Sequence, residues 1–439
     1  MTQSDRRVVI TGMGLISPIG NSSTDLWDSL SQQKSGVRLL SNLPTEHFPS
    51  DFGGECTDFT GSIDSFGPLE KKLQRSIKKG LRLMCREIQL GAAAAQLALA
   101  NSGLDSGSID PSRIGTLFGS DYIITSPLDF VEGIRGCLDE DEKFNFDKWA
   151  EHGLPKVEPL WLLKYLPNMP ASHVAIYNDL RGPSNSITVR EASANLAIAE
   201  ATTIIKRGSA DFMVAGSTGS RIHPLRTVHI AIQEQLANRH TESAGGDPTK
   251  ACRPFDKNRT GMTLGEGAGV LILEELSSAE KRGANILGEV VGYGSSCVAD
   301  KNGAANYHQA FTNVLLGGLE TSGVDASTIG HIHAHGLGSL QCDLQESQAI
   351  ADVMTETPVT AAKSYMGNLG GGCGIVEIAA SLMAMEKGPL FPILNCDDLD
   401  EQCPINAVQT NDVKAGDSFI NLNVTPQGQA SSVVIKKYQ

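Results

Sequence analysis

The stretch Gly182-Pro-Ser-Asn-Ser-Ile-Thr-Val-Arg-Glu191-Ala-Ser-Ala-Asn195 carries the strongest local signal in the chain. A short extended run turns directly into the start of a helix, which we predict over residues 192–206. Such a junction directs free backbone N–H groups and a partial positive charge at the side chain in the turn. A cysteine there would be stabilised as a thiolate nucleophile. Glu191 is stabilised equally well, but a carboxylate is a poor acyl acceptor, so the stretch predicts a catalytic scaffold without its nucleophile.

Strands and helices alternate on both sides of this turn, which predicts an α/β fold with layers of helices around central sheets. We predict strands at 7–14, 114–119, 211–216, 269–274, 287–292 and 331–335, and helices at 83–104, 306–322 and 375–387. Residues from about 126 to 165 are irregular and include the acidic run 139–143, so we predict an inserted surface excursion there. No low-complexity linker divides the chain, which favours one compact body of two halves.

Composition describes an ordinary globular protein. The chain has 439 residues, of which 40% are hydrophobic and 20% are charged. No apolar run reaches the roughly 18 residues that a membrane span needs, so none is expected. No signal peptide fits the start of the sequence, and we expect a cytoplasmic protein. The net charge of −14 argues against nucleic acid as the main partner.

The nine cysteines form no CxxC pair and have no histidines at ligand spacing, so neither a metal site nor a disulfide framework is expected. Cys373, within Gly370-Gly-Gly-Cys-Gly374, has two interpretations. It is either a displaced nucleophile or, as is usual for buried cysteine, a small residue tolerated in a tight glycine loop.

One short helical segment is strongly basic. It contains Lys71, Lys72, Arg75, Lys78, Lys79, Arg82 and Arg86. Such a run is either a solvated helix face or a surface that steers an acidic partner, and the sequence leaves both readings open.

Three further loops accompany the Glu191 turn. They are His333-Ala-His335-Gly-Leu-Gly-Ser339, Lys363-Ser-Tyr-Met-Gly-Asn368 with the glycine loop after it, and the segment 253–267. Together these segments resemble the β-ketoacyl synthases, the elongating condensing enzymes of fatty acid and polyketide synthesis in the thiolase superfamily. The resemblance implies a thiolase-type duplicated fold, a five-layered αβαβα sandwich with two five-stranded sheets, and a dimer. We place the two halves at residues 1–257 and 258–439.

In that family a cysteine accepts the acyl group from an acyl carrier protein, and two histidines assist decarboxylation of malonyl-carrier protein. A lysine supports the site through a buried glutamate. Carried over by position, the resemblance puts Glu191 at the cysteine, His335 and Asn368 at the histidines, and Lys363 with Glu377 at the supporting pair. Ser339 keeps a hydroxyl of the histidine loop, whereas Leu337 replaces a threonine. Pro426 falls in the C-terminal turn that lends a backbone N–H to the oxyanion, and proline has no N–H to lend.

These substitutions leave several functions open. Condensation without a thiol is disfavoured, since a carboxylate would form a mixed anhydride. His335 and Asn368 could still donate hydrogen bonds to a thioester oxygen and permit decarboxylation, although an ionised Glu191 would repel the malonyl carboxylate. Alternatively, Glu191 forms a structural ion pair with Arg190, Lys363 or a cation of a partner chain. Lys363 and Glu377 are then a retained buried pair.

The interpretation that fits best is a degenerate member resembling a chain length factor. It belongs to an acyltransferase family, lacks condensing activity, and binds an acyl carrier protein and an acyl chain. We expect a homodimer, or a heterodimer with an active ketosynthase, and no cofactor. The alternatives are a malonyl-acyl carrier protein decarboxylase that uses His335 and Asn368, and a stand-alone homodimer that binds the carrier protein. The basic residues Lys71, Lys72, Arg75, Lys78, Lys79 and Arg82 are the candidate docking surface.

Overall fold

The strands of the two halves form one continuous path in the computed structural model, which describes residues 6–43, 45–105, 107 and 109–438. Among these residues, a first group of five strands runs in the order β5-β4-β6-β7-β1 and a second group in the order β8-β13-β12-β9-β10. Their bounds are β5 (Ser184–Thr188), β4 (Ile114–Ser120), β6 (Phe212–Ser220), β7 (Leu264–Glu275), β1 (Val8–Ile16), β8 (Gly288–Cys297), β13 (Gln429–Lys436), β12 (Ser418–Val424), β9 (His331–His333) and β10 (Pro358–Thr360). β11 (Asn406–Ala407) extends the second group, and β2 (Val37–Leu39) with β3 (Phe52–Gly54) lies beside β7.

The two five-stranded groups repeat one pattern of strand directions. In the first, β5, β4 and β6 are parallel while β7 and β1 are antiparallel additions. In the second, β10, β9 and β12 are parallel while β13 and β8 are antiparallel. Only a short pairing of Val9 and Ile10 with Glu289 and Gly288 joins them in the described chain. This duplicated arrangement confirms the predicted thiolase-type fold.

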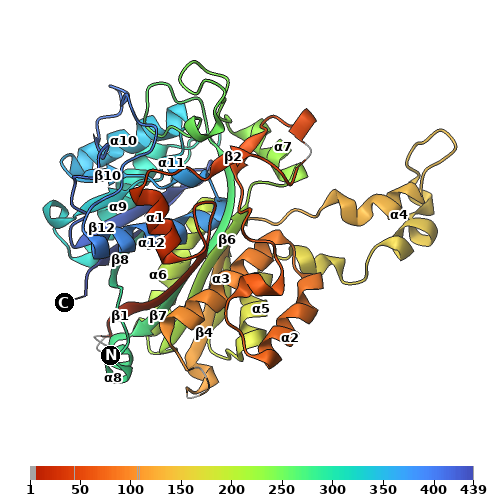
Figure 1. The fold of residues 1–439 in the computed structure, drawn as a ribbon, viewed down its shortest axis with the longest axis horizontal. Coiled ribbons are helices and arrows are strands. Elements are labelled where there is room, and N and C mark those ends of the chain that lie inside the picture. Colours follow the sequence, from red (N-terminus) through yellow and green to blue (C-terminus); the bar gives the residue numbers. More distant parts are fainter. Residues whose placement is uncertain (1–5, 44, 106, 108, 439) are drawn as a thin grey trace.

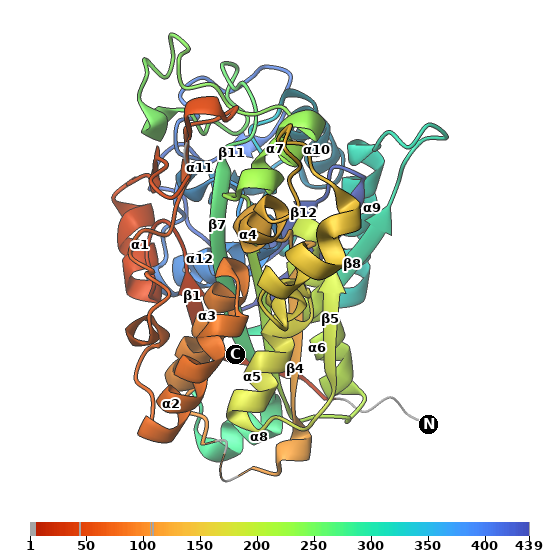
Figure 2. The same cartoon turned by 90° about the vertical axis from the view of Figure 1, so that its right-hand side faces the viewer.

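Helices separate and cover the two groups of strands (Figures 1 and 2). α3 (Arg86–Ser102) and α5 (Met169–Asn178) pack on the outer face of the first group. α6 (Ser193–Lys206) and α12 (Cys373–Lys387) lie between the groups and contact strands of both. α9 (Tyr307–Ser322) covers the second group, with α10 (Leu340–Met354) packed against it. The result is the five-layer order α, β, α, β, α.

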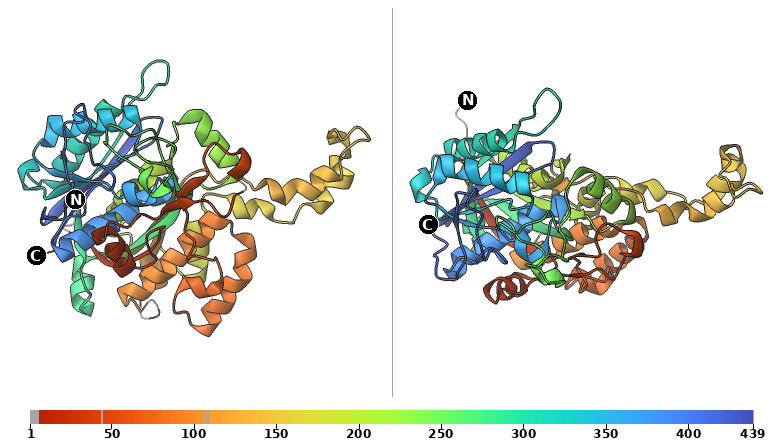
Figure 3. Two further views of the ribbon diagram at one scale, coloured as in Figure 1. Left: turned by 45° about the horizontal axis from the view of Figure 1, so that its top comes forward. Right: turned by 90° about the horizontal axis from the view of Figure 1, so that it is seen from above.

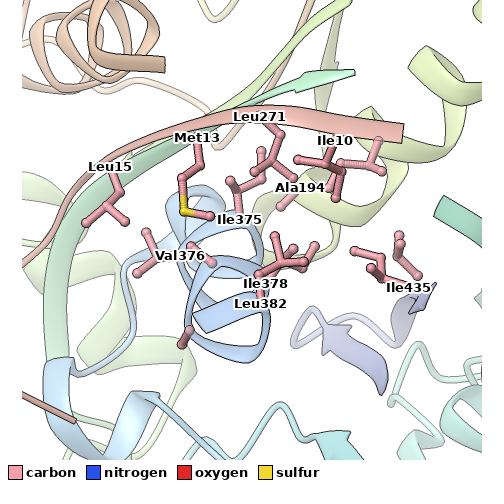
Figure 4. Packing of buried hydrophobic residues seen from close by; sticks show 14 of the residues in the cluster. Ile10, Met13, Leu15, Ala194, Leu271, Ile375, Val376, Ile378, Leu382 and Ile435 are labelled. Carbon is pink, nitrogen blue, oxygen red and sulfur yellow. The ribbon is translucent and has the colours of Figure 1, made fainter. Parts of the chain in front are cut away.

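The central helix layer is the core of the molecule. α12 is apolar on nearly every face because both neighbours are sheets, and residues 373–385 are all buried. Figure 4 shows Ile375, Val376 and Ile378 of α12 among Met13 and Leu271 of the first group of strands. Burying such side chains stabilises the fold by roughly 1.5–3 kcal/mol each.

The remaining helices are α1 (Ser23–Ser31), α2 (Lys71–Gly80), α4 (Val131–Arg135), α7 (Pro224–Gln233), α8 (Leu276–Arg282) and α11 (Lys363–Met366). All but α11 lie at the periphery; the four residues of α11 are buried. Residues 126–165, for which we predict a surface excursion, contain α4 and several single-turn helices. They project from the body as an arm (Figures 1 and 3). The division at residue 257 remains a prediction; β7, which follows it in the chain, pairs with β1 and β6.

Candidate active site

The turn that carries Glu191 has an unusual backbone. Beyond β5 the chain passes through Arg190, whose φ of 51° lies in the left-handed region, and a single 3-10 turn leads into α6. A non-glycine residue in this conformation costs on the order of 1–3 kcal/mol and must be held by its surroundings. Here the Ser193 hydroxyl donates to the Arg190 carbonyl over 2.5 Å. Glu191 is only 1% exposed, so the strained turn presents a carboxylate to the protein interior.

Cations and an amide enclose the Glu191 carboxylate. Arg221 Nη2 donates to Glu191 Oε1, and Asn368 Nδ2 donates to the same oxygen over 3.0 Å. Arg190 Nε lies 3.7 Å from Glu191 Oε2. Of the cations that the sequence suggested as partners, Arg190 is therefore adjacent and Lys363 is paired elsewhere. Sequence reasoning missed Arg221; its one local signal is an arginine placed directly after the fully buried strand β6.

The ion pair is part of a larger buried network. Glu234 Oε1 accepts from Arg190 Nη2 over 2.6 Å and from Arg221 Nη1 over 3.3 Å, and Asp121 lies 3.9 Å from Arg190 Nε. Arg221 is fully buried, and this burial lowers its pKa while the Glu234 charge opposes the shift. A guanidinium nevertheless stays charged in proteins. The turn thus holds compensating charges where an acyl acceptor would need an open space.

His335 and Lys363 form a second buried cluster. Lys363 Nζ lies 3.3 Å from His335 Nδ1 and donates to Glu377 Oε1. Asn423 donates to the other Glu377 oxygen over 2.8 Å. Burial is the largest influence on the pKa of Lys363 and lowers it, but the charge and hydrogen bond of Glu377, together with Cys373 and Glu346 nearby, leave that pKa raised. Burial, with Lys363 and Arg221 nearby, holds the pKa of His335 well below its usual value. A neutral His335 that accepts from Lys363 at Nδ1 carries its proton on Nε2 and remains a donor there.

Asn368 has no free N–H. Besides its bond to Glu191, its Nδ2 lies 2.9 Å from the Met262 sulfur. Its oxygen accepts from the Gly370 backbone over 3.0 Å and from Cys373 Sγ over 3.2 Å. Burial raises the pKa of Cys373 to about 12, so its thiol stays protonated. Cys373 is therefore a structural residue of the glycine loop rather than a displaced nucleophile.

Ser339 lies at a helix start rather than beside Glu191. Its hydroxyl accepts from the Cys342 backbone over 3.1 Å and caps α10. Two buried carboxylates of α10 hold the loop before it. Asp343 accepts from the Leu337 and Gly338 N–H groups, and Glu346 accepts from those of His335 and Gly336. Burial raises the pKa of Asp343 to about 6 and that of Glu346 to about 8. The loop that positions His335 is thus fixed by α10.

The C-terminal turn is a tight hairpin between β12 and β13. The Gly428 N–H donates to the Thr425 carbonyl over 2.9 Å, and Pro426 lies within the turn. Tyr307 donates its hydroxyl proton to the Pro426 carbonyl over 3.2 Å. This turn accepts a hydrogen bond where a backbone donor is expected from the resemblance.

The basic surface lies on α2 and the turn after it. Its members, which we call the basic patch, are exposed and have no ion-pair partner in the described part of the chain: Lys71, Lys72, Arg75, Lys78, Lys79 and Arg82. Arg86 differs, because it pairs with Glu266 over 2.7 Å and lies over the Phe59 ring at the start of α3. The sequence grouped Arg86 with this run, but the structure uses it as an internal contact.

The described residues contain no group of three or more histidine, cysteine, aspartate or glutamate side chains placed to hold a metal ion. Within that same part of the chain, no helix is long and apolar enough to cross a membrane.

Two family models match most of the chain. The N-terminal domain of β-ketoacyl synthases matches residues 5–279, and the C-terminal domain matches residues 287–397. With the duplicated fold, these matches define a ketosynthase-type protein. The 3-oxoacyl-[acyl-carrier-protein] synthase 2 of Synechocystis sp. is 31% identical over 417 residues, covering 92% of this chain and 91% of that protein. Its namesake from Coxiella burnetii is 32% identical over 415 residues, covering 92% and 91%. The chain therefore belongs to the β-ketoacyl synthase family.

Solved structures agree with this placement. A β-ketoacyl synthase from Burkholderia phymatum superposes with a TM-score of 0.82 at 26% identity, covering 99% of this chain and 100% of that one. The ishigamide ketosynthase/chain length factor gives 0.81 at 24% identity, again covering 99% and 100%. A type II polyketide ketosynthase in complex with its acyl-carrier protein gives 0.81 at 23%, covering 99% and 100%. The last two likenesses show a shared fold.

Proposed function

We propose that this protein is a non-condensing ketosynthase-like subunit, comparable to a chain length factor, that works beside an active ketosynthase. One observation carries the proposal: the carboxylate of Glu191, the residue that the resemblance aligns with the nucleophile, is closed in by Arg221 and Asn368. A carboxylate held by a buried guanidinium is a weaker nucleophile than a free one. Its attack on a thioester would also strand the Arg221 charge in the interior.

The network also limits where an acyl chain can lie. Glu191, Arg221 and Asn368 are each at most 1% exposed, so they fill the space beside the turn. The subunit would therefore contribute a wall of the acyl cavity at the interface with its partner. The growing chain would be bound to the partner's nucleophile.

A decarboxylase is the second candidate, and one observation favours it. Neutral His335 keeps an Nε2–H donor that could stabilise a developing enolate oxygen. The second donor is occupied, because Asn368 already bonds Glu191 and Met262. The ionised Glu191 would also repel the substrate carboxylate. These two effects favour the non-catalytic interpretation.

The basic patch is the proposed dock for an acyl carrier protein. Six exposed cations on one surface attract an acidic partner and speed its encounter. The ketosynthase complex with an acyl-carrier protein, whose fold this chain shares, supports a carrier protein as the partner.

Association with a second subunit is proposed from two exposed features. β5 is the last strand of the path, and its outer edge has no strand neighbour in the described residues. The arm exposes Leu128 and Phe146 by 77% and 73%. Unpaired strand edges and exposed apolar side chains are usually covered by another chain. The second subunit is either an identical copy or an active ketosynthase.

The deciding experiment measures products on the carrier protein by mass spectrometry. Malonyl-carrier protein and acyl-carrier protein are incubated with the purified chain, alone and together with an active ketosynthase from the same organism. We expect no β-ketoacyl or acetyl product from the chain alone, and longer acyl products from the mixture than from the ketosynthase alone. Acetyl-carrier protein formed by the chain alone, and lost in His335→Ala, would establish the decarboxylase instead.

A further inference from the structure

A cavity of about 260 Å³ lies on the first half, apart from the Glu191 turn. Three segments meet around it: the start of α3, the chain after β4, and the link between β6 and α7. Its walls include Cys85, Glu87, Ile123, Ile124, Ile222 and His223. Ile123, Ile124 and Ile222 are partly exposed, so the cavity opens to the surface. A cavity of about 150 Å³ holds benzene in another protein, so this one admits a somewhat larger molecule.

Glu87 brings an acceptor to the cavity. It is 5% exposed, and its Oε1 accepts from Arg226 Nη1 over 2.5 Å. Its Oε2 is buried and accepts no hydrogen bond from any residue that the structure describes. Burial raises the pKa of Glu87 to about 7, so above that pH this oxygen belongs to a carboxylate. A buried carboxylate oxygen without a donor costs about 1–3 kcal/mol, so a ligand that supplies a donor is favoured.

His223 brings a donor to the same cavity. Its Nδ1 accepts from the backbone N–H groups of Leu225 and Arg226 over 3.2 and 3.4 Å, where it caps α7. Burial, with Arg226 nearby, lowers the pKa of His223 to about 4, so the ring is neutral. The proton is therefore on Nε2, and Nε2 has no acceptor among the described residues.

The other polar groups of the wall already have partners in the described chain. Arg86 pairs with Glu266, Tyr165 donates its hydroxyl to Asp129, Ser220 Oγ donates to the Ile222 carbonyl, and the Ser126 hydroxyl accepts from the Leu128 N–H. Burial raises the pKa of Cys85 to about 12, so its thiol is not a nucleophile at neutral pH. The isoleucine side chains provide non-directional hydrophobic contact. The cavity thus combines an apolar body with one acceptor and one donor.

We infer that this cavity binds an apolar molecule, or an apolar chain segment, that carries a single hydroxyl group. The hydroxyl donates its proton to Glu87 Oε2 and accepts from His223 Nε2–H, while the hydrocarbon part contacts Ile123, Ile124 and Ile222. A hydroxyl is both donor and acceptor, so it satisfies both groups at once. An ether of the same shape accepts but does not donate, and leaves Glu87 without a donor.

Saturation-transfer NMR with the full chain tests this inference, using 2-phenylethanol and its methyl ether as probes. We expect the alcohol to bind and the ether to bind about tenfold more weakly, as the loss of one hydrogen bond predicts. Glu87→Gln should abolish this preference, because Arg226 retains the amide oxygen and the amide N–H₂ faces the cavity. Thermal melting followed by circular dichroism checks that each variant folds.

Ile222→Phe fills the cavity without touching either polar group, and it should remove binding of both probes. Ile176→Phe, at a surface position that is 72% exposed, is the matched control and should change neither. Equal affinity for alcohol and ether in the unmodified chain would overturn the inference. Failure of both probes to bind, or binding that survives Ile222→Phe, would overturn it as well. If Glu87→Gln does not fold, the inference is still tested by comparing the alcohol with the ether in the unmodified chain and by the loss of binding in Ile222→Phe.

Discussion

Glu191 and Arg221 form a buried ion pair at the turn before α6. Such pairs add little net stability compared with apolar side chains, since both charges must be removed from water. Losing one partner is different, because it leaves a charge uncompensated in the interior. Here Asn368 and the Glu234–Arg190 pair surround the two charges, so neither can move to solvent. The network is stable while all its members are present, and a substitution that removes one charge destabilises it.

A double-mutant cycle tests this unit. Glu191→Ala and Arg221→Ala should each lower the free energy of unfolding by about 3 kcal/mol, and the double variant by clearly less than the sum. Urea unfolding measures all three. Glu158→Ala, which removes an exposed partner of Lys164, is the control and should change stability by less than about 1 kcal/mol. Additive losses would show that the two residues do not act as a pair.

At the scale of elements, β9 carries a row of buried imidazoles into the site. His331 Nδ1 lies 2.7 Å from the Ala415 carbonyl oxygen, and its Nε2 lies 3.0 Å from Ser381 Oγ. His333 Nδ1 lies 2.9 Å from the same hydroxyl. Burial lowers the pKa of His331 from 6.5 to about 4 and holds that of His333 well below its usual value. The strand is therefore neutral, and its hydrogen bonds require unprotonated rings.

This neutrality predicts a pH dependence. A histidine of the unfolded chain gains a proton below about pH 6.5, whereas folded His331 gains one only near pH 4. The stability that a neutral His331 contributes above about pH 6.5 is therefore lost as the pH falls from about 6.5 toward 4. His331→Gln removes this contribution. Between about pH 7 and 5.5 the variant should lose about 1 kcal/mol less stability than the unmodified chain, as measured by urea unfolding.

The comparison of variant with parent is needed because buried acids act in the opposite direction. Glu346, whose pKa is raised to about 8, destabilises the fold as the pH rises through that range. Identical pH profiles for the parent chain and His331→Gln would show that His331 is not held neutral by the fold.

The basic patch on α2 and the turn after it is expected to attract an acidic carrier protein. Lys72→Glu with Lys79→Glu should weaken binding of an acidic carrier protein at least about tenfold at low ionic strength, and the difference should shrink as salt screens the charges. Surface plasmon resonance across a salt series measures it. Lys281→Glu, an exposed lysine of α8, is the control. A loss that salt does not reduce would argue against steering by charge.

The arm dominates the outline of the whole molecule (Figure 3). Its rings pack on one another, with Phe130 and Trp161 edge to face and their centroids 4.9 Å apart, so it is an ordered projection rather than a loose loop. In the isolated chain, the exposed apolar side chains of the arm stay in water and contribute no burial energy. They fit a molecule whose working form includes a second subunit.

Association can be tested by charge placed on the arm. Leu128→Asp with Phe146→Asp should shift the chain toward monomer, or raise the dissociation constant for its partner by about tenfold or more, since a buried unpaired charge opposes association. Multi-angle light scattering and analytical ultracentrifugation measure the change. Ile176→Asp, outside the arm, is the control. An unchanged oligomeric state would place the interface elsewhere.

Local signals were enough for several of the elements. The predicted strand at 114–119 is β4, and the helix predicted over 192–206 is α6, because periodic burial and glycine punctuation act over a few neighbouring residues. The assignment of Glu191, His335, Lys363 and Asn368 to a catalytic site rests on the resemblance and stays a prediction.

Only the tertiary structure decided what these residues touch. Arg221 reaches Glu191 across 30 residues of sequence, and Asn368 reaches it across 177. Arg86 pairs with Glu266 and so is not part of the exposed basic patch, and Ser339 caps a helix. The cavity beside Glu87 and His223 joins three separate segments. Ion pairs, hydrogen bonds and cavities depend on distances between atoms, and packing of the two halves sets those distances, whereas sequence spacing constrains only near neighbours.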